Sequence, residues 1–227
     1  MLAKATIVAL TQLLLTQGAG ATILPGGVKM DILKRAKEIV LNPKGNWPVI
    51  KGENVEVKEL FINYAAPLAL IPAIAGFIGM ALIGMRIPSG EVLRAPFIES
   101  LAGGVIGYVL QLAGVLAGAW VVKYLAPSFN SKADLTLAAK LVVYAMTPVW
   151  LLGVVQIIPG LGILSILGLY AIYLLAVGLP ALLDTPPDKV VWFTGAIIIA
   201  SIVISFILSI VVVGAIYGPM YMRMMSV

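Results

Sequence analysis

We predict an all-α fold for this sequence: a polytopic membrane protein with five transmembrane helices and an N-terminal amphipathic helix in the membrane interface. Of its 227 residues, 61% are hydrophobic and 11% are charged, and the mean hydropathy is +1.08. Soluble domains usually carry about a quarter charged residues, so the composition excludes an ordinary soluble protein, a disordered chain and a fibrous repeat. The lengths of the apolar stretches and the distribution of basic residues then give the number and direction of the spans.

Apolar stretches set the number of spans, because a bilayer core of about 30 Å needs roughly 20 apolar residues per helix. Four uncharged stretches meet that length: 60–83, 101–122, 141–183 and 190–217. The third, as one helix, would be about twice as long as the bilayer is thick, so the chain must fold back within it. The sequence Pro-Gly-Leu-Gly at 159–162 favours a hairpin between helices at 141–158 and 161–183, which gives five spans. A re-entrant pair that does not cross fully is the alternative, because Pro148, Gly160 and Gly162 interrupt both halves.

Lysine and arginine are unevenly distributed between the two sides that these spans define. Alternate segments hold eleven of them: Lys29, Lys34, Arg35, Lys37, Lys44, Lys51, Lys58, Lys123, Lys132, Lys140 and Lys189. The opposite segments hold three: Arg86, Arg94 and Arg223. Since basic residues are retained on the cytoplasmic side, we predict a cytosolic N-terminal segment and a C-terminus outside.

Several kinds of chemistry are excluded by residue types that the sequence lacks. It has no cysteine and no histidine, so it can form neither a disulfide nor a thiolate metal site and lacks the commonest general base. No Asp, Glu, Lys or Arg falls within the five expected spans, which argues against ion-coupled pumps and intramembrane proteases. The net charge of +5 flanks the spans, so it does not indicate a nucleic-acid partner. We therefore expect no enzyme activity, no cofactor and no metal site.

An amphipathic helix is expected at 31–41, ahead of the first span. Its apolar face is formed by Ile32, Leu33, Ala36, Ile39 and Val40. Its polar face carries Lys34, Arg35, Lys37 and Glu38. A basic amphipathic helix beside a span is typical of the cytoplasmic membrane interface, with Trp47 at headgroup depth. The favoured interpretation is an anchor to the lipid bilayer, and the alternative is a binding element for a protein partner.

The first 29 residues allow three interpretations. Lys4, an apolar run and Ala19-Gly20-Ala21 are typical of a signal peptide, yet cleavage there would send the following basic segment outside. We favour a start at Met30, with 1–29 a leader or an over-extended N-terminus, and an extra interfacial helix is the third option. The other expected regions are a cytosolic juxtamembrane segment at 30–59, the transmembrane domain at 60–217 and a Met-rich tail at 218–227.

Two stripes of small residues indicate helix packing. One lies in the second span and the other in the last: Gly103, Gly107, Gln111, Gly114 and Gly118, then Ser201, Ser205 and Ser209. Small residues let two helix backbones approach closely in lipid, and Gln111 can form a hydrogen bond across the contact. We expect packing within one bundle or a homo-oligomer, with a polar pore lining as the alternative.

A candidate ligand or pore site lies around the kink in the third expected helix. Its residues are Tyr144, Thr147, Pro148, Gln156, Tyr170 and Tyr173. Pro148 removes a backbone hydrogen bond and can expose a carbonyl to a ligand, as in transporters. The alternative is an internal cluster of polar side chains that satisfy one another.

Motifs of proline, glycine and tyrosine follow one another in a fixed order along nearly the whole chain after the leader. They are Arg35-Ala36-Lys37-Glu38-Ile39, Asn42-Pro43, Trp47-Pro48-Val49-Ile50 and Glu53; Tyr64-Ala65-Ala66-Pro67-Leu68, Ile71-Pro72-Ala73 and Gly76-Phe77-Ile78-Gly79; Tyr144-Ala145-Met146-Thr147-Pro148-Val149-Trp150, Gly153 and Ile158-Pro159-Gly160-Leu161-Gly162; Leu169-Tyr170-Ala171-Ile172-Tyr173-Leu174-Leu175, Gly178-Leu179-Pro180 and Pro187-Asp188-Lys189. In their order and spacing they resemble the Yip1-domain family, and most closely its short prokaryotic members.

The resemblance implies a five-helix bundle with a cytosolic N-terminus in a prokaryotic plasma membrane, and a chain that begins near Met30. In eukaryotes the family is linked to small Rab-type GTPases and vesicle traffic. We therefore expect a non-enzymatic membrane protein that organises the membrane or acts as an adaptor through helix–helix and protein contacts. The alternative function is a passive channel or carrier for a small solute, an ion or a lipid.

Overall fold

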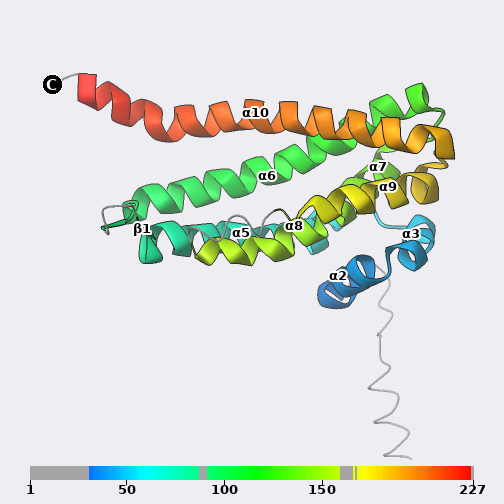
Figure 1. Cartoon of the computed structure of the whole chain (residues 1–227), viewed down its shortest axis with the longest axis horizontal. Coiled ribbons are helices and arrows are strands. Elements are labelled where there is room, and N and C mark those ends of the chain that lie inside the picture. The colour runs from blue at the N-terminus through cyan, green and yellow to red at the C-terminus, as the bar shows by residue number, and fades with distance from the viewer. Residues whose placement is uncertain (1–30, 87–90, 159–165, 167, 226–227) are drawn as a thin grey trace, which may run out of the picture. The chain divides into compact units, whose positions relative to one another are not determined.

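The computed structural model describes residues 31–86, 91–158, 166 and 168–225, with the side chains of 85–86 and 211–225 left aside. Residues 1–29 and the expected hairpin at 159–162 lie outside the described residues, so the predictions for them stay predictions. The chain separates into two units, Met1–Asp31 and Ile32–Val227, and the helices described below belong to the second. In this unit the protein is an all-α polytopic membrane protein, shown in Figure 1.

Two short helices precede the first span: α2 (Ile32–Leu41) and α3 (Pro43–Gly52). The Asn42 side chain caps α3 by accepting a hydrogen bond from the Gly45 backbone N–H at 3.2 Å. Pro43 follows at the first helical position, where its missing N–H costs nothing. On the expected apolar face of α2, Ala36 and Ile39 are buried by the protein, whereas Leu33 is 76% exposed.

The first span is a continuous apolar helix over Val57–Ile83. It consists of α4 (Val57–Leu60), η1 (Phe61–Ala65), α5 (Ala66–Phe77) and η2 (Ile78–Ile83). η1 and η2 are wide π-type turns, and η1 ends just before Pro67, which cannot donate a backbone hydrogen bond. After the span, β1 (Met85–Arg86) pairs antiparallel with β2 (Val92–Leu93). Gly84 makes the turn between η2 and β1 with a φ of 79°, a conformation that glycine adopts without strain.

Two long helices form one side of the bundle: α6 (Phe97–Leu125), which η3 (Ala126–Phe129) extends, and α10 (Pro187–Met225). In Figure 1 the orange part of α10 lies beside α6, and the two helices are in contact. α10 has 39 residues, or about 58 Å at 1.5 Å per residue, against a bilayer core of about 30 Å. The backbone of the expected Met-rich tail is therefore part of this helix as far as Met225.

The third span begins earlier than the sequence analysis expects. It consists of α7 (Leu135–Ala145), α8 (Thr147–Leu152) and η4 (Gly153–Ile157). The Asp134 side chain caps α7 by accepting a hydrogen bond from the Leu137 backbone N–H at 2.7 Å. Lys140, expected in the preceding loop, therefore lies inside α7 and is only 2% exposed. The expectation that the spans hold no ionisable side chain is wrong at this residue.

Among the described residues, four helices are long and apolar enough to cross a membrane: Val57–Ile83, Phe97–Phe129, Leu135–Ile157 and Pro187–Ile210. A fifth apolar helix, α9 (Tyr170–Leu183), has 14 residues and is about 21 Å long, shorter than the bilayer core. Five full crossings therefore stay a prediction.

The chain returns in α9 to the end of the bundle from which α7 departs. The Lys132 backbone N–H, just before α7, donates to the Leu183 carbonyl at 2.9 Å. The Ser131 hydroxyl donates to the Thr185 hydroxyl oxygen at 2.8 Å. α10 therefore starts at the end where α7 starts, whether the intervening segment crosses twice or is re-entrant.

The core lies where α3, α7 and α9 meet. The Trp47 side chain is fully buried there by other parts of the protein, and its expected headgroup depth stays a prediction. A Cβ atom at Gly178 of α9 would lie 2.9 Å from the Trp47 ring and 2.5 Å from the Leu141 Cδ1 atom. Because real Cβ atoms do not approach so closely, only glycine at this position allows α9 to pack against the indole.

Gly178→Ala tests this contact. The added methyl group overpacks the Trp47 site, and we expect the free energy of unfolding to fall by about 1–3 kcal/mol. Gly195→Ala is the matched control, because its Cβ position in α10 meets no atom within 4 Å. There the gain in helix propensity should stabilise the protein by about 0.5–1 kcal/mol. Thermal unfolding in detergent measures both variants, and a melting temperature raised equally by both would contradict the contact.

Candidate functional site

A cluster of charged and aromatic side chains joins the α2–α3 pair to the transmembrane helices. We call it the docking cluster, and its members come from α2, α3 and the residue that follows it, η1, α7 and α8. They are Arg35, Trp47, Glu53, Tyr64, Lys140, Tyr144 and Thr147.

Arg35 forms an ion pair with Glu53 and thereby ties α2 to the end of α3. The Arg35 side chain is 15% exposed, so it points inward from α2 instead of lying on the polar outer face that the sequence pattern gives it. This orientation turns Leu33 outward. Asn46 adds a second link, because its amide donates to the carbonyls of Glu38 at 3.1 Å and Asn42 at 3.0 Å.

Lys140 binds the C-terminal end of α3. Its ammonium donates to the Ile50 carbonyl at 2.9 Å and to the Glu53 carbonyl at 2.5 Å. The last carbonyls of a helix lack partners within the helix and carry the negative end of its dipole, so a cation is favoured there. A buried ammonium without such partners would be very costly. The two hydrogen bonds therefore explain how α7 can carry a lysine in its buried face.

Lys140 is not predicted from the sequence as a site residue, because a basic residue beside an apolar run is typical of a loop that flanks a membrane. A signal for it was nevertheless present. Asp134 followed by an uninterrupted helical pattern is a typical N-terminal cap. A helix started at 135 places Lys140 in its second turn, inside the span.

Tyr144 lies at the centre of the aromatic part of the docking cluster. Its ring centroid is 4.8 Å from that of Tyr64 and 6.4 Å from that of Trp47, the latter in an edge-to-face arrangement. The guanidinium carbon of Arg35 lies 6.0 Å from the same ring, within cation–π range. The ring therefore connects the ion pair of the α2–α3 pair with the first and third spans.

Thr147 and Tyr64 form a buried hydrogen bond between the third and first spans. Their hydroxyl oxygens are 2.8 Å apart, and both side chains are fully buried. Pro148 follows Thr147 in the first turn of α8 and is buried as well. Of the six residues predicted for a ligand or pore site, Tyr144 and Thr147 thus belong to the docking cluster.

The other three predicted site residues make contacts elsewhere. The Tyr170 hydroxyl donates to the Val40 carbonyl of α2 at 2.8 Å, and the Tyr170 ring lies against that of Tyr173, with centroids 5.3 Å apart. Gln156 lies on η4 against the first span, where a Cβ atom at Gly79 would come within 2.2 Å of its carbonyl oxygen.

The predicted glycine stripe on α6 is divided between partners within the chain. A Cβ atom at Gly114 would lie 3.1 Å from the Leu208 side chain of α10. One at Gly118 would lie 3.4 Å from the Val142 side chain of α7. The Gly107 position meets no atom within 4 Å. Gly103 and Gln111 lie on the same helix.

The predicted serine stripe on α10 faces outward. Ser201, Ser205 and Ser209 are all exposed. The hydroxyls of Ser201 and Ser209 donate to backbone carbonyls one turn earlier, at 2.8 and 2.7 Å. These two hydroxyls are therefore satisfied by their own helix.

The docking cluster acts as a clamp. Arg35 opposes Glu53, Lys140 binds backbone carbonyls, and Tyr64 and Thr147 bind each other. Within the described residues, no group of three or more His, Cys, Asp or Glu side chains gathers in a way that could hold a metal ion. This arrangement holds the α2–α3 pair against the first and third spans.

Lys140→Met tests the clamp. The variant leaves the Ile50 and Glu53 carbonyls without their ammonium partner, at a cost of about 1–3 kcal/mol. We expect α3 to open more often, so trypsin should cleave after Lys51 and Lys58 about tenfold faster or more. Lys132→Met, which removes an exposed lysine from the neighbouring loop, is the control. Equal cleavage rates in the two variants would show that Lys140 does not hold α3.

Comparison with known proteins identifies the family of this chain. The Yip1 domain model matches residues 37–210, which include all of the docking cluster except Arg35. The chain is 27% identical over 182 residues to "Inner membrane protein YohC" of Escherichia coli strains K12 and O6:H1 CFT073, covering 78% of this chain and 93% of each relative. No solved structure matches. The family match spans well over half of the sequence, and the protein therefore belongs to the Yip1 domain family.

Proposed function

We propose that this protein is a non-enzymatic, multi-pass protein of a prokaryotic plasma membrane. In this proposal it organises the membrane or acts as an adaptor through contacts of its helices. Its family and its similarity to an inner membrane protein of Escherichia coli support the location. The proposed regions are the juxtamembrane segment at 30–59, which includes the α2–α3 pair, and the membrane domain at 60–217, with 218–227 as its C-terminal continuation.

The docking cluster is the observation that carries the organising role. It fixes the α2–α3 pair to the spans, so the pair presents a constant surface instead of a mobile arm. The same cluster uses the polar groups that a passive path could have employed. The Tyr64 and Thr147 hydroxyls bind each other at 2.8 Å and are fully buried. This closed pairing favours an organising protein over the channel or carrier.

The proposed orientation places the α2–α3 pair on the cytosolic side of the membrane and the C-terminus outside. Three basic segments support it because they meet at one end of the bundle. Lys51 of α3 forms an ion pair with Asp184 at 2.6 Å, and the Lys132 backbone binds Leu183 at 2.9 Å. The segments that charge assigns to one side are thus neighbours in the fold, as the positive-inside rule requires.

Self-association is part of the proposal. Gly114 and Gly118 pack against Leu208 and Val142 of the same chain. Gly107 and the exposed serine stripe of α10 are the small residues left for a second copy. Small residues on exposed faces let helices of two copies approach closely in lipid.

Liposome flux is the experiment that tests the function. The purified protein would be reconstituted and assayed with small ions, neutral solutes and labelled lipids. We expect flux within about twofold of protein-free liposomes, and no change on Thr147→Val, because the Tyr64–Thr147 contact is a buried packing contact. Flux that correctly folded protein supports and Thr147→Val abolishes would overturn the proposal in favour of a channel or carrier.

Cysteine labelling tests the orientation, since the natural sequence has no cysteine. Asn54→Cys lies just after α3, and Glu91→Cys lies in the hairpin at the other end of the first span; both side chains are exposed. An impermeant maleimide should label Glu91→Cys on intact spheroplasts and Asn54→Cys only after permeabilisation. The reverse pattern would place the N-terminal segment outside.

A further inference from the structure

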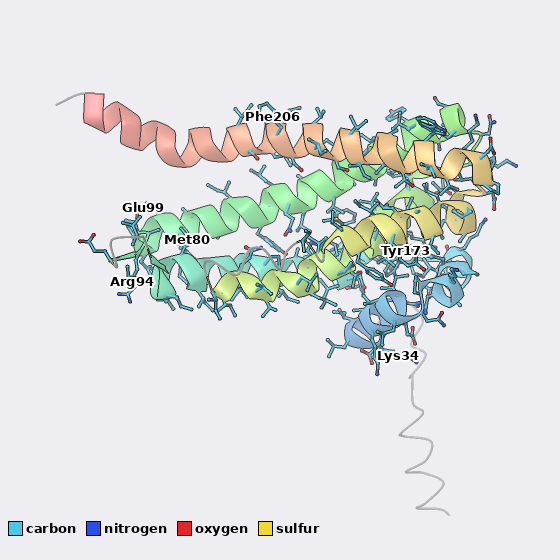
Figure 2. The ribbon with its side chains drawn as sticks, viewed as in Figure 1. Lys34, Met80, Arg94, Glu99, Tyr173 and Phe206 are labelled. Carbon is cyan, nitrogen blue, oxygen red and sulfur yellow. The ribbon has the colours of Figure 1, made fainter. Side chains whose placement is uncertain are left out.

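The outward side of the α2–α3 pair combines exposed leucine with exposed lysine. Leu33 and Leu41 of α2 are 76% and 71% exposed, and Val49 of α3 is 55% exposed. Lys37 of α2 and Lys44 of α3 are exposed as well. Leu33, Lys37 and Leu41 follow one another at four-residue steps and so share one helix face. We call these five residues the outer face of the pair; Figure 2 shows the neighbouring Lys34 on the side of α2 that points away from the other helices.

The docking cluster is the reason that this face is exposed. Arg35 points inward to Glu53, and Ala36 and Ile39 are buried. With these residues directed at the bundle, the geometry of a helix leaves Leu33 and Leu41 on the opposite side. The exposure of this face therefore follows from the way Arg35 and the buried residues of α2 pack against the bundle.

The position of the α2–α3 pair in the fold indicates the surroundings of the outer face. α2 is in contact with α8, and α3 is in contact with α9, so the pair lies against the flank of the membrane bundle. In a bilayer the surroundings of such a flank are lipids. Exposed leucine and valine side chains gain free energy by leaving water for the acyl boundary, while lysines reach the headgroups.

Charge selects the kind of lipid. The pair, over residues 32–52, carries five basic residues and one acidic residue. Arg35 forms an ion pair with Glu53, and Lys51 forms one with Asp184. The acidic residue, Glu38, lies 3.9 Å from Arg35. Basic charge thus predominates on the pair, to which Lys37 and Lys44 of the outer face belong. A phosphate-bearing anionic headgroup is complementary to this charge.

We propose that the outer face binds anionic phospholipid of the bilayer that the protein spans, with Leu33, Leu41 and Val49 at the acyl boundary and Lys37 and Lys44 on the phosphates. The inference rests on the proposed organising role, for which it names the lipid that the pair engages. It gives that role a physical basis: a fixed helix pair that gathers anionic lipid beside the bundle.

A single labelled cysteine tests this proposal in the whole protein. Leu41→Cys would carry an environment-sensitive fluorophore in nanodiscs with a rising fraction of phosphatidylglycerol in phosphatidylcholine. Doxyl-labelled lipid reports contact with the bilayer, and iodide reports exposure to water. We expect lipid quenching to rise and iodide quenching to fall as phosphatidylglycerol increases.

Charge-matched variants separate the face from general electrostatics. Lys37→Gln/Lys44→Gln removes two lysines from the face, whereas Lys58→Gln/Lys132→Gln removes two exposed lysines elsewhere. A lysine near an anionic surface contributes about fivefold to binding. We therefore expect the first double variant to raise the phosphatidylglycerol fraction at which lipid quenching is half-maximal about tenfold or more, or to abolish the rise in quenching. The second double variant should leave this fraction within about twofold of the natural protein.

Each other outcome overturns the proposal. Iodide access in discs rich in phosphatidylglycerol would show that the face is left in water or for a protein partner. Equal lipid quenching in both lipids, or equal effects of the two double variants, would show that no anionic headgroup is recognised there. None of these results bears on liposome flux, so the organising role can fail or stand independently.

Discussion

The hydrogen bonds of Lys140 to the end of α3 are the constraint on which the rest of the fold depends. An ammonium buried in a membrane helix must have partners, and here the partners are the carbonyls of Ile50 and Glu53, at 2.9 and 2.5 Å. Their position requires α3 to lie across α7, which brings Trp47 against Tyr144. The α2–α3 pair is thereby part of the bundle's core, although its composition is that of a surface segment.

Close helix contacts make the same bundle compact around the docking cluster. A Cβ atom at Gly153 would lie 2.5 Å from the Pro72 side chain, and one at Gly178 would lie 2.9 Å from the Trp47 ring. At each of these two glycines the neighbouring helix therefore comes too close for a larger residue. Proline on one helix and glycine on the next form a matched pair, because the ring of Pro72 fills the space that Gly153 leaves. Such packing favours a fixed scaffold over a solvent-lined path.

The spans could be predicted from the sequence because a helix in lipid needs a long apolar run, and such a run is visible in consecutive residues. The details that failed depend on partners far along the chain. Lys140 looks like a loop residue until Ile50, 90 positions away, is placed beside it. Arg35 appears on the polar face of its helix because nothing local reveals that it pairs with Glu53. Thr147 was a predicted site residue, but its partner Tyr64 is 83 positions earlier, beyond any pattern of helical spacing.

The long separation between the two sides of the docking cluster has a consequence for how the protein is made. Ribosomes add about 5–20 residues per second, so Lys140 emerges roughly 5–20 seconds after Ile50. Until then the contacts available to the pair are local: the Asn42 cap, the Asn46 links and the Arg35–Glu53 ion pair, all complete within 19 residues. These contacts can shape the two helices before the third span exists. The α2–α3 pair can therefore take shape before Lys140, its partner in the third span, has been synthesised.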